Sequence, residues 1–389
     1  MRLVLRRVAC GRLLVMALCG MAVTLVPAAG WSESPPPAPP AKQSAPPATP
    51  AKQSAPTAPP AKDSAPPAPA KQGTPTLPPS AATAGPTTDL TREAEPAIER
   101  GLRWLKDSQQ TDGSWGDHFQ VASTALALIA HMARGYTPGV DPYGKVIDKG
   151  VEYLLNESKS SPSGYMGTSM YEHGLATLAL SELWGQTDRD DDIKTALKAA
   201  VEVILRSQNR SGGWRYNPRP TDADISVTVM QTVALASARQ AGILIPDRTI
   251  DAAVRYIKAV RDPATGGFTY QGGGAPGFAR TAAGVFALIT CGEGKSEEAQ
   301  GGLEYLLAAP ERTFRDTEWY WYAHYYAMLV MHRAGDEQFK KWYTQVRGAV
   351  LQKQAKDGHW DGEGGAAYGT AMAIIVLSIP YDFVPAYQR

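Results

Sequence analysis

The stretch that decides the fold runs from Ala200 to Ala238 and reads AVEVILRSQNRSGGWRYNPRPTDADISVTVMQTVALASA. Its first part has the apolar spacing of an amphipathic helix, which the pair Gly212-Gly213 ends. A loop around Trp214 follows, and a second helix, rich in small and apolar residues, begins near Ile225. The stretch therefore predicts a helical hairpin with a glycine and a tryptophan in its loop.

The hairpin recurs along the chain at spacings of 45 to 52 residues. The hydrophobic pairs near the end of each first helix are Trp104-Leu105, Tyr153-Leu154, Ile204-Leu205, Tyr256-Ile257, Tyr305-Leu306 and Val350-Leu351. A glycine and an aromatic residue follow five of them: Gly113 and Trp115, Gly164 and Tyr165, Gly213 and Trp214, Gly267 and Phe268, Gly358 and Trp360. Glycine permits the backbone that ends a helix, and the ring fills the gap between hairpins, so we expect these residues to be structural.

The second helix of each hairpin is apolar nearly all round, as expected of a helix buried on several sides. These helices are predicted at 122–134, 171–184, 225–241, 279–291, 319–334 and 366–379. The first helices carry more charge. Six hairpins that are polar outside and apolar inside predict an all-α protein with an inner and an outer ring of helices, although an open solenoid would give the same pattern.

Composition and charge define where the folded part lies. The chain has 389 residues, is 43% hydrophobic and has a formal net charge of +1. Residues 1–88 have eight basic and two acidic residues, a net charge of +6, which leaves residues 89–389 net negative. We therefore predict one large helical domain over 89–389 and no nucleic-acid binding.

Residues 1–30 have the pattern of a signal peptide: four arginines, an apolar run from Leu13 to Val26 and small residues at Ala28-Ala29-Gly30. The alternative is an uncleaved membrane anchor. We predict cleavage, so that the protein is exported to the periplasm or cell envelope and meets the membrane only transiently, through its signal peptide. Cleavage would leave Cys291 as the one cysteine and allow no internal disulfide.

Residues 31–88 are rich in Pro, Ala and Lys, with the repeat AKQSAP at Ala41 and Ala51. Such a composition cannot bury a core and predicts a disordered, extended linker. We expect it to tether the folded domain in the envelope.

The repeats resemble those of the α/α toroid of prenyltransferases and squalene cyclases. QQTDGSWG from Gln109 and QNRSGGW from Gln208 are similar to the Q…GxW loops of those families. The chain also resembles single-domain bacterial prenyltransferase and squalene-oxidase repeat proteins. The resemblance implies six inner helices around a cavity, whose mouth lies where the loops lead into those helices. The candidate cavity residues are Tyr171, Glu172, His173, Arg280, Glu318, Trp319 and His324.

The squalene and hopene cyclases carry a D-x-D-D-T-A motif whose middle aspartate protonates an alkene. The corresponding residues here include Asp222 and Asp224, and the partner acid is replaced by Ile225. Asp224 is therefore the candidate general acid, with Asp222 beside it. The alternative is that either aspartate caps the helix that begins near Ile225.

No cofactor or metal is expected. Prenyltransferases of this fold hold zinc with an Asp, a Cys and a His, and this sequence has no D-x-C segment. His173 and His324 fall in the first turns of predicted inner helices, where they either reach the cavity or form buried hydrogen bonds.

Three function classes remain open. The first is a toroid that binds a hydrophobic, isoprenoid-like ligand or an envelope protein without cyclising a substrate, because the fold signature is complete and the catalytic motif is not. The second is a terpenoid-cyclase-like enzyme that uses Asp224 as its acid. The third is a polysaccharide-acting toroid with paired carboxylates, such as Glu172 with Asp224 or Glu318, about 5 to 10 Å apart.

Overall fold

The computed structural model describes residues 90–387, which contain twelve α-helices and no β-strand. The predicted signal peptide at 1–30 and the linker at 31–88 lie outside the described residues. None of the described helices is long and apolar enough to cross a bilayer.

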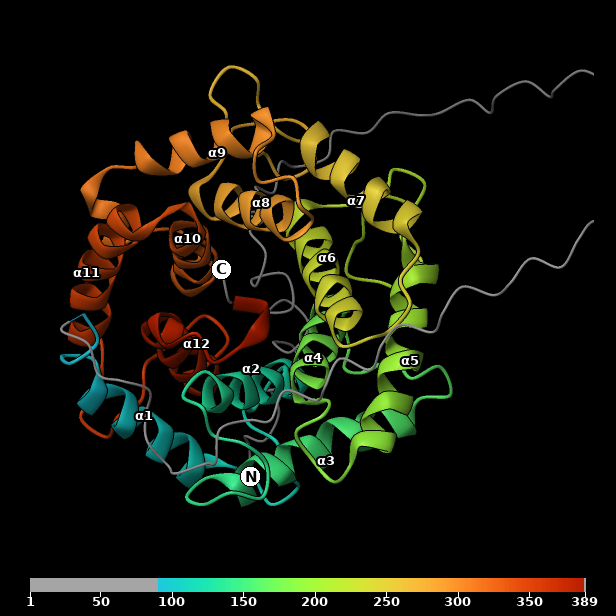
Figure 1. Ribbon diagram of the computed structural model, residues 1–389, viewed down its shortest axis with the longest axis vertical. Helices are drawn as coiled ribbons and strands as arrows, with labels where there is room; N and C mark the ends of the chain where they lie inside the picture. Colours follow the sequence, from blue (N-terminus) through green and yellow to red (C-terminus); the bar gives the residue numbers. More distant parts are fainter. Residues whose placement is uncertain (1–89, 388–389) are drawn as a thin grey trace, which may run out of the picture. The chain divides into compact units, whose positions relative to one another are not determined.

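Six helices form the inner ring: α2 (Gln120–Met132), α4 (Met170–Leu183), α6 (Ile225–Gln240), α8 (Phe278–Thr290), α10 (Tyr320–Ala334) and α12 (Ala366–Ser378). The outer ring consists of α1 (Glu95–Ser108), α3 (Gly144–Ser160), α5 (Asp190–Ser207), α7 (Asp247–Ala259), α9 (Glu297–Leu307) and α11 (Asp336–Gln352). Figure 1 shows the two rings, with α12 returning beside α2. The ring closes, so the predicted α/α toroid is confirmed and the open solenoid is wrong.

The sequence explains which helices lie inside. Nearly every residue of α2, α4, α6 and α12 is buried, whereas α1 and α7 bury one apolar stripe each. Small residues let the inner helices approach closely. A Cβ atom at Gly174 of α4 would lie 2.7 Å from the side chain of Gln231 in α6. The predicted second helices match the observed ones within two residues at each end.

Each Q…GxW loop lies between the two helices of one hairpin, and its glutamine forms a hydrogen bond to the next hairpin. Trp214 is fully buried, and its indole Nε1 donates to the carbonyl of Ile204 at 2.8 Å. The side chain of Gln208 donates to Gly212 in its own loop and to Thr249 in α7 of the following hairpin. The predicted structural role of the loop tryptophan is therefore confirmed.

The last loop uses the same bonds to close the ring. Gln354 donates to the carbonyl of Gly358 in its own loop, at 2.8 Å, and to that of Ala97 in α1, also at 2.8 Å. Trp360, fully buried like Trp214, donates to Val350. The sixth hairpin is thus fastened to the first by side chains of the repeat signature itself.

The loop glycines are required for two reasons. Gly212 has a φ of +94°, and a Cβ atom there would lie 2.2 Å from the carbonyl oxygen of Ala252 in α7.

In the third and fourth loops the positive φ falls on Gly212 and Gly266, one residue before the expected Gly213 and Gly267. The sequence pattern is ambiguous there because both loops have two adjacent glycines.

The C-terminal segment crosses the end of the inner ring at which the inner helices finish. The guanidinium of Arg333 in α10 donates to the carbonyl of Ala386 at 2.9 Å, and the Ala386 amide donates to Glu182 of α4 at 3.3 Å. Val384 is buried between these contacts. Two cavities lie at the opposite end, where the inner helices begin.

Candidate functional site

Two cavities lie at the beginnings of the inner helices. One, of about 140 Å³, is named here the Trp319 cavity and is lined by Ser226, Tyr270, Gly277, Phe278, Ala279, Arg280, Thr317, Glu318, Trp319 and Tyr322. The other, of about 120 Å³, is the Tyr171 cavity and is lined by Phe119, Ala122, Ser123, Thr168, Ser169, Tyr171, Glu172, Leu175, Tyr216, Asn217, Gly364 and Tyr368. Together they receive residues at or near the first turns of all six inner helices, as the resemblance implies.

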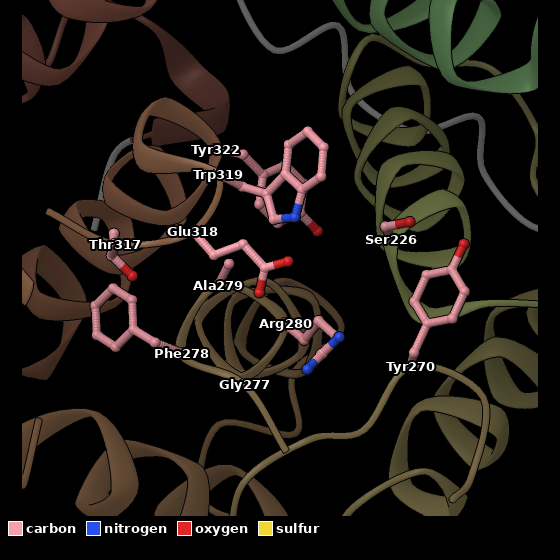
Figure 2. Close-up of a pocket in the computed structure, with 10 residues that line it drawn as sticks. All are labelled: Ser226, Tyr270, Gly277, Phe278, Ala279, Arg280, Thr317, Glu318, Trp319 and Tyr322. Atoms are coloured by element: carbon pink, nitrogen blue, oxygen red, sulfur yellow. The ribbon is translucent and has the colours of Figure 1, made fainter. Parts of the chain in front are cut away.

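The Trp319 cavity combines aromatic rings with two charged side chains. Figure 2 shows the carboxylate of Glu318 and the guanidinium of Arg280 projecting into one hollow, beside the Trp319 ring. Phe278 begins α8 and Tyr322 lies in the first turn of α10. The cavity can therefore hold the apolar part of a ligand against the aromatic rings, while the polar end of the same ligand contacts Glu318 or Arg280.

The Tyr171 cavity is more apolar. Its one carboxylate belongs to Glu172, which is buried and accepts hydrogen bonds from the amide and the hydroxyl of Thr168, at 3.1 and 2.7 Å. Tyr171, Tyr216 and Tyr368 supply its rings. Because Glu172 and Glu318 line different cavities, the structure does not bring this predicted carboxylate pair into one hollow.

A pair of tyrosines links the two cavities. The hydroxyl oxygens of Tyr216, in the Tyr171 cavity, and Tyr270, in the Trp319 cavity, lie 3.1 Å apart. The guanidinium of Arg215 donates to Tyr270 at 3.3 Å. No sequence pattern singled out these three residues, because they come from loops rather than from a periodic helix face.

Asp224 lies behind the wall of the Trp319 cavity. It is fully buried and is the N-cap of α6, where its Oδ1 accepts from the Val227 amide at 2.9 Å and from the Ser226 hydroxyl at 2.5 Å. Its Oδ2 accepts from Arg215 at 3.1 Å. The structure thus shows the capping role, and Ser226, rather than Asp224, lines the cavity.

Burial raises the pKa of the Asp224 carboxyl, and the hydrogen bonds from Ser226 and Val227 oppose that rise. Asp222, in contrast, is largely exposed, with its Oδ2 3.5 Å from Nε of Arg215. It borders a polar cleft with Gln208, Tyr256 and neighbouring loop residues, outside both cavities.

The two candidate histidines are buried away from the cavities. Nε2 of His173 donates to the carbonyl of Ala200 in α5, while Nδ1 accepts from the Met166 amide, both at 3.1 Å. Nε2 of His324 donates to Thr313 at 3.0 Å. Burial lowers the pKa of each to about 4, so both are neutral at pH 7. The prediction that they line the cavity is not met, whereas the buried, hydrogen-bonded alternative describes them.

Two aromatic residues have an uncommon backbone conformation at the mouth. Phe119 has φ 53° and ψ 44°, and Trp319 has φ 58° and ψ 53°, in the left-handed region that bulky residues rarely adopt. Each is the N-cap of an inner helix and lines a cavity. Such conformations cost energy and persist only where the surrounding structure enforces them. They are found more often at active sites and ligand sites.

Among residues 90–387 there is no cluster of three His, Cys, Asp or Glu side chains able to hold a metal ion.

No protein-family model matches the chain. Its fold is similar to that of an alpha-1,6-mannanase from Salegentibacter sp. HEL1_6, with a TM-score of 0.56 and 9% identity over 73% of this chain and 97% of that one. A cellobiose 2-epimerase from Bacillus thermoamylovorans B4167 gives a TM-score of 0.57 and 11% identity, over 74% of this chain and 98% of that one. The type II terpene cyclase MstE from Scytonema gives 0.52 and 13%, over 75% and 100%.

These neighbours are α/α toroids with different activities, so the comparison supports the class and does not single out the prenyltransferases. Residues 90–387 form an α/α toroid with two small cavities at the mouth of its inner ring. Identities of 9 to 13% show the fold alone, and the function has to be argued from the site.

Proposed function

We propose that this protein is an exported binding toroid, which takes the apolar part of an isoprenoid-like ligand, or of an envelope protein, at the mouth of its inner ring and does not cyclise it. The observation that carries the proposal is the position of Asp224. Its carboxylate is fully buried and holds the start of α6, while the aromatic rings around it line the cavities.

A cyclase acid has to reach the alkene that it protonates. In this toroid, Ser226 and Tyr270 line the cavity beside Asp224, and Arg215 pairs with the carboxylate. The cyclase alternative would need Asp224 to leave its hydrogen bonds with Arg215, Ser226 and Val227, the last of which caps α6.

Both cavities are too small to enclose a folded polyene, which favours binding over cyclisation. Pockets for drug-sized ligands measure about 300 to 1,000 Å³, whereas the Trp319 and Tyr171 cavities measure about 140 and 120 Å³. Each accommodates one end of a long molecule, or one side chain of a partner, rather than a folded polyene. On this proposal, residues 31–88 keep the toroid tethered in the envelope.

The test combines binding with turnover. Purified full-length protein is titrated with farnesol by calorimetry and, separately, incubated with squalene, with gas chromatography and mass spectrometry of the products. We expect saturable farnesol binding that Trp319→Ala weakens at least tenfold, and unchanged squalene. A cyclised product that disappears with Asp224→Asn would overturn the proposal in favour of the cyclase.

A further inference from the structure

The Trp319 cavity contains two opposite charges from adjacent parts of the inner ring. Arg280 lies in the first turn of α8, and Glu318 lies just before α10. Figure 2 shows both side chains entering the space between Trp319 and Tyr270. A ligand in this cavity therefore meets a cation and an anion at once.

Among residues 90–387, neither Arg280 nor Glu318 forms an ion pair. The guanidinium of Arg280 makes one long hydrogen bond, to the Ala275 carbonyl at 3.3 Å, and its Nε is buried without a partner. Arg280 is partly buried and Glu318 is exposed. An apolar ligand without a polar end would take water from the guanidinium and give it no partner, which is unfavourable.

The backbone around Arg280 is shaped for its side chain. Gly277 precedes α8, and a Cβ atom there would lie 2.6 Å from Nη2 of Arg280. Gly277 also caps α8 without a side chain, so the helix presents its positive end at the same wall. The Arg280 side of the cavity thus favours a carboxylate, and the Glu318 side favours an ammonium group.

The remaining wall is apolar and small. Phe278, Trp319 and Tyr322 supply rings around a volume of about 140 Å³, which is close to the size of an engineered cavity that holds benzene. The space therefore suits one compact group with a hydrocarbon portion, while the two charges suit its polar end.

We infer that the Trp319 cavity recognises a bipolar group, an ammonium beside a carboxylate, as in a free amino acid with a hydrocarbon side chain. The inference rests on the proposed function, because it assumes that ligands enter at this mouth, and it names the chemistry of the group that enters. A neutral sugar ring of similar size would satisfy hydrogen bonds but would leave both charges without counter-charges.

The experiment is calorimetric titration of full-length protein with leucine, N-acetyl-leucine, leucinamide and methyl mannoside. We expect leucine to bind at least about tenfold more tightly than either blocked form, since each blocked form loses one charge-assisted interaction. Glu318→Gln should abolish the preference over N-acetyl-leucine, and Arg280→Gln the preference over leucinamide. Glu202→Gln and Arg255→Gln, at exposed positions of the outer ring, are the matched controls and should keep both preferences.

Equal binding of leucine and its blocked forms, or binding of methyl mannoside alone, would overturn the inference. A farnesol titration separates it from the proposed function. Farnesol binding without leucine discrimination contradicts only the bipolar group, whereas the failure of every probe contradicts the inference and the proposed function together.

Discussion

The carboxylate of Asp224 lies 3.1 Å from the guanidinium of Arg215 and 2.9 Å from the amide of Val227. One buried side chain thus neutralises a loop arginine and caps an inner helix. The residue at the position that resembles a cyclase acid therefore stabilises the fold. Its contribution to the free energy of unfolding can be measured without a ligand.

Replacing Asp224 by Ala should lower the free energy of unfolding by about 2 kcal/mol or more, because the helix loses its cap and Arg215 loses its buried partner. Urea denaturation measures the change. Asp222→Asn, at the exposed neighbour, is the control and should stay within about 0.5 kcal/mol. Equal effects of the two variants would contradict the capping role.

Three of the buried histidines predict acid sensitivity. Burial lowers the pKa of His131, His173 and His324 from 6.5 to about 4. Because the unfolded chain binds more protons between these two pH values, stability should be complete above pH 6.5 and fall towards pH 4. His173→Gln should reduce that loss by on the order of 1 to 2 kcal/mol, as measured by urea unfolding at pH 7 and pH 4.5. An unchanged slope, equal to that of the exposed control His118→Gln, would contradict the assignment.

Gln354 contributes to ring closure through two hydrogen bonds. Gln354→Ala removes the bonds to Ala97 and Gly358 and should cost about 1 to 2 kcal/mol of unfolding free energy. Hydrogen exchange should also rise in α1, which loses its fastening to the last loop. Gln345→Ala, exposed on α11, should change neither quantity.

The close approach at Gly212 predicts a large effect of one methyl group. Gly212→Ala would place Cβ 2.2 Å from the Ala252 oxygen and should destabilise the toroid by about 2 kcal/mol or more. A Cβ atom at Gly273 meets nothing within 4 Å, so Gly273→Ala should be nearly neutral in the same thermal melt. Similar melting temperatures for both variants would refute the packing described for the loop.

Residues 31–88 are predicted from their composition to be a tether that packs on nothing. Their deletion should therefore leave the melting temperature of the toroid unchanged within about 2 °C. A larger decrease in a scanning calorimeter would mean that this segment stabilises the folded domain.

The helices could be predicted from the sequence because the two rings bury different parts of their helices. Inner helices are apolar all round, whereas outer helices have apolar residues on one side only. The cavity residues were harder to predict, because one residue along a helix turns the side chain by about 100°. Glu172 consequently faces the Tyr171 cavity while His173 points back to α5. Tyr216 and Tyr270 lie in irregular loops, whose positions no periodicity fixes, and the left-handed backbone of Trp319 has no glycine to mark it.

The most direct test of the binding role is mass spectrometry of the molecules that copurify with the full-length protein. We predict a compound with an apolar portion, near one per toroid, in wild type and Glu202→Gln, and its depletion in Trp319→Ala. Cyclised products that accumulate with wild type and vanish with Asp224→Asn, or extracts that are identical for wild type and Trp319→Ala, would contradict it.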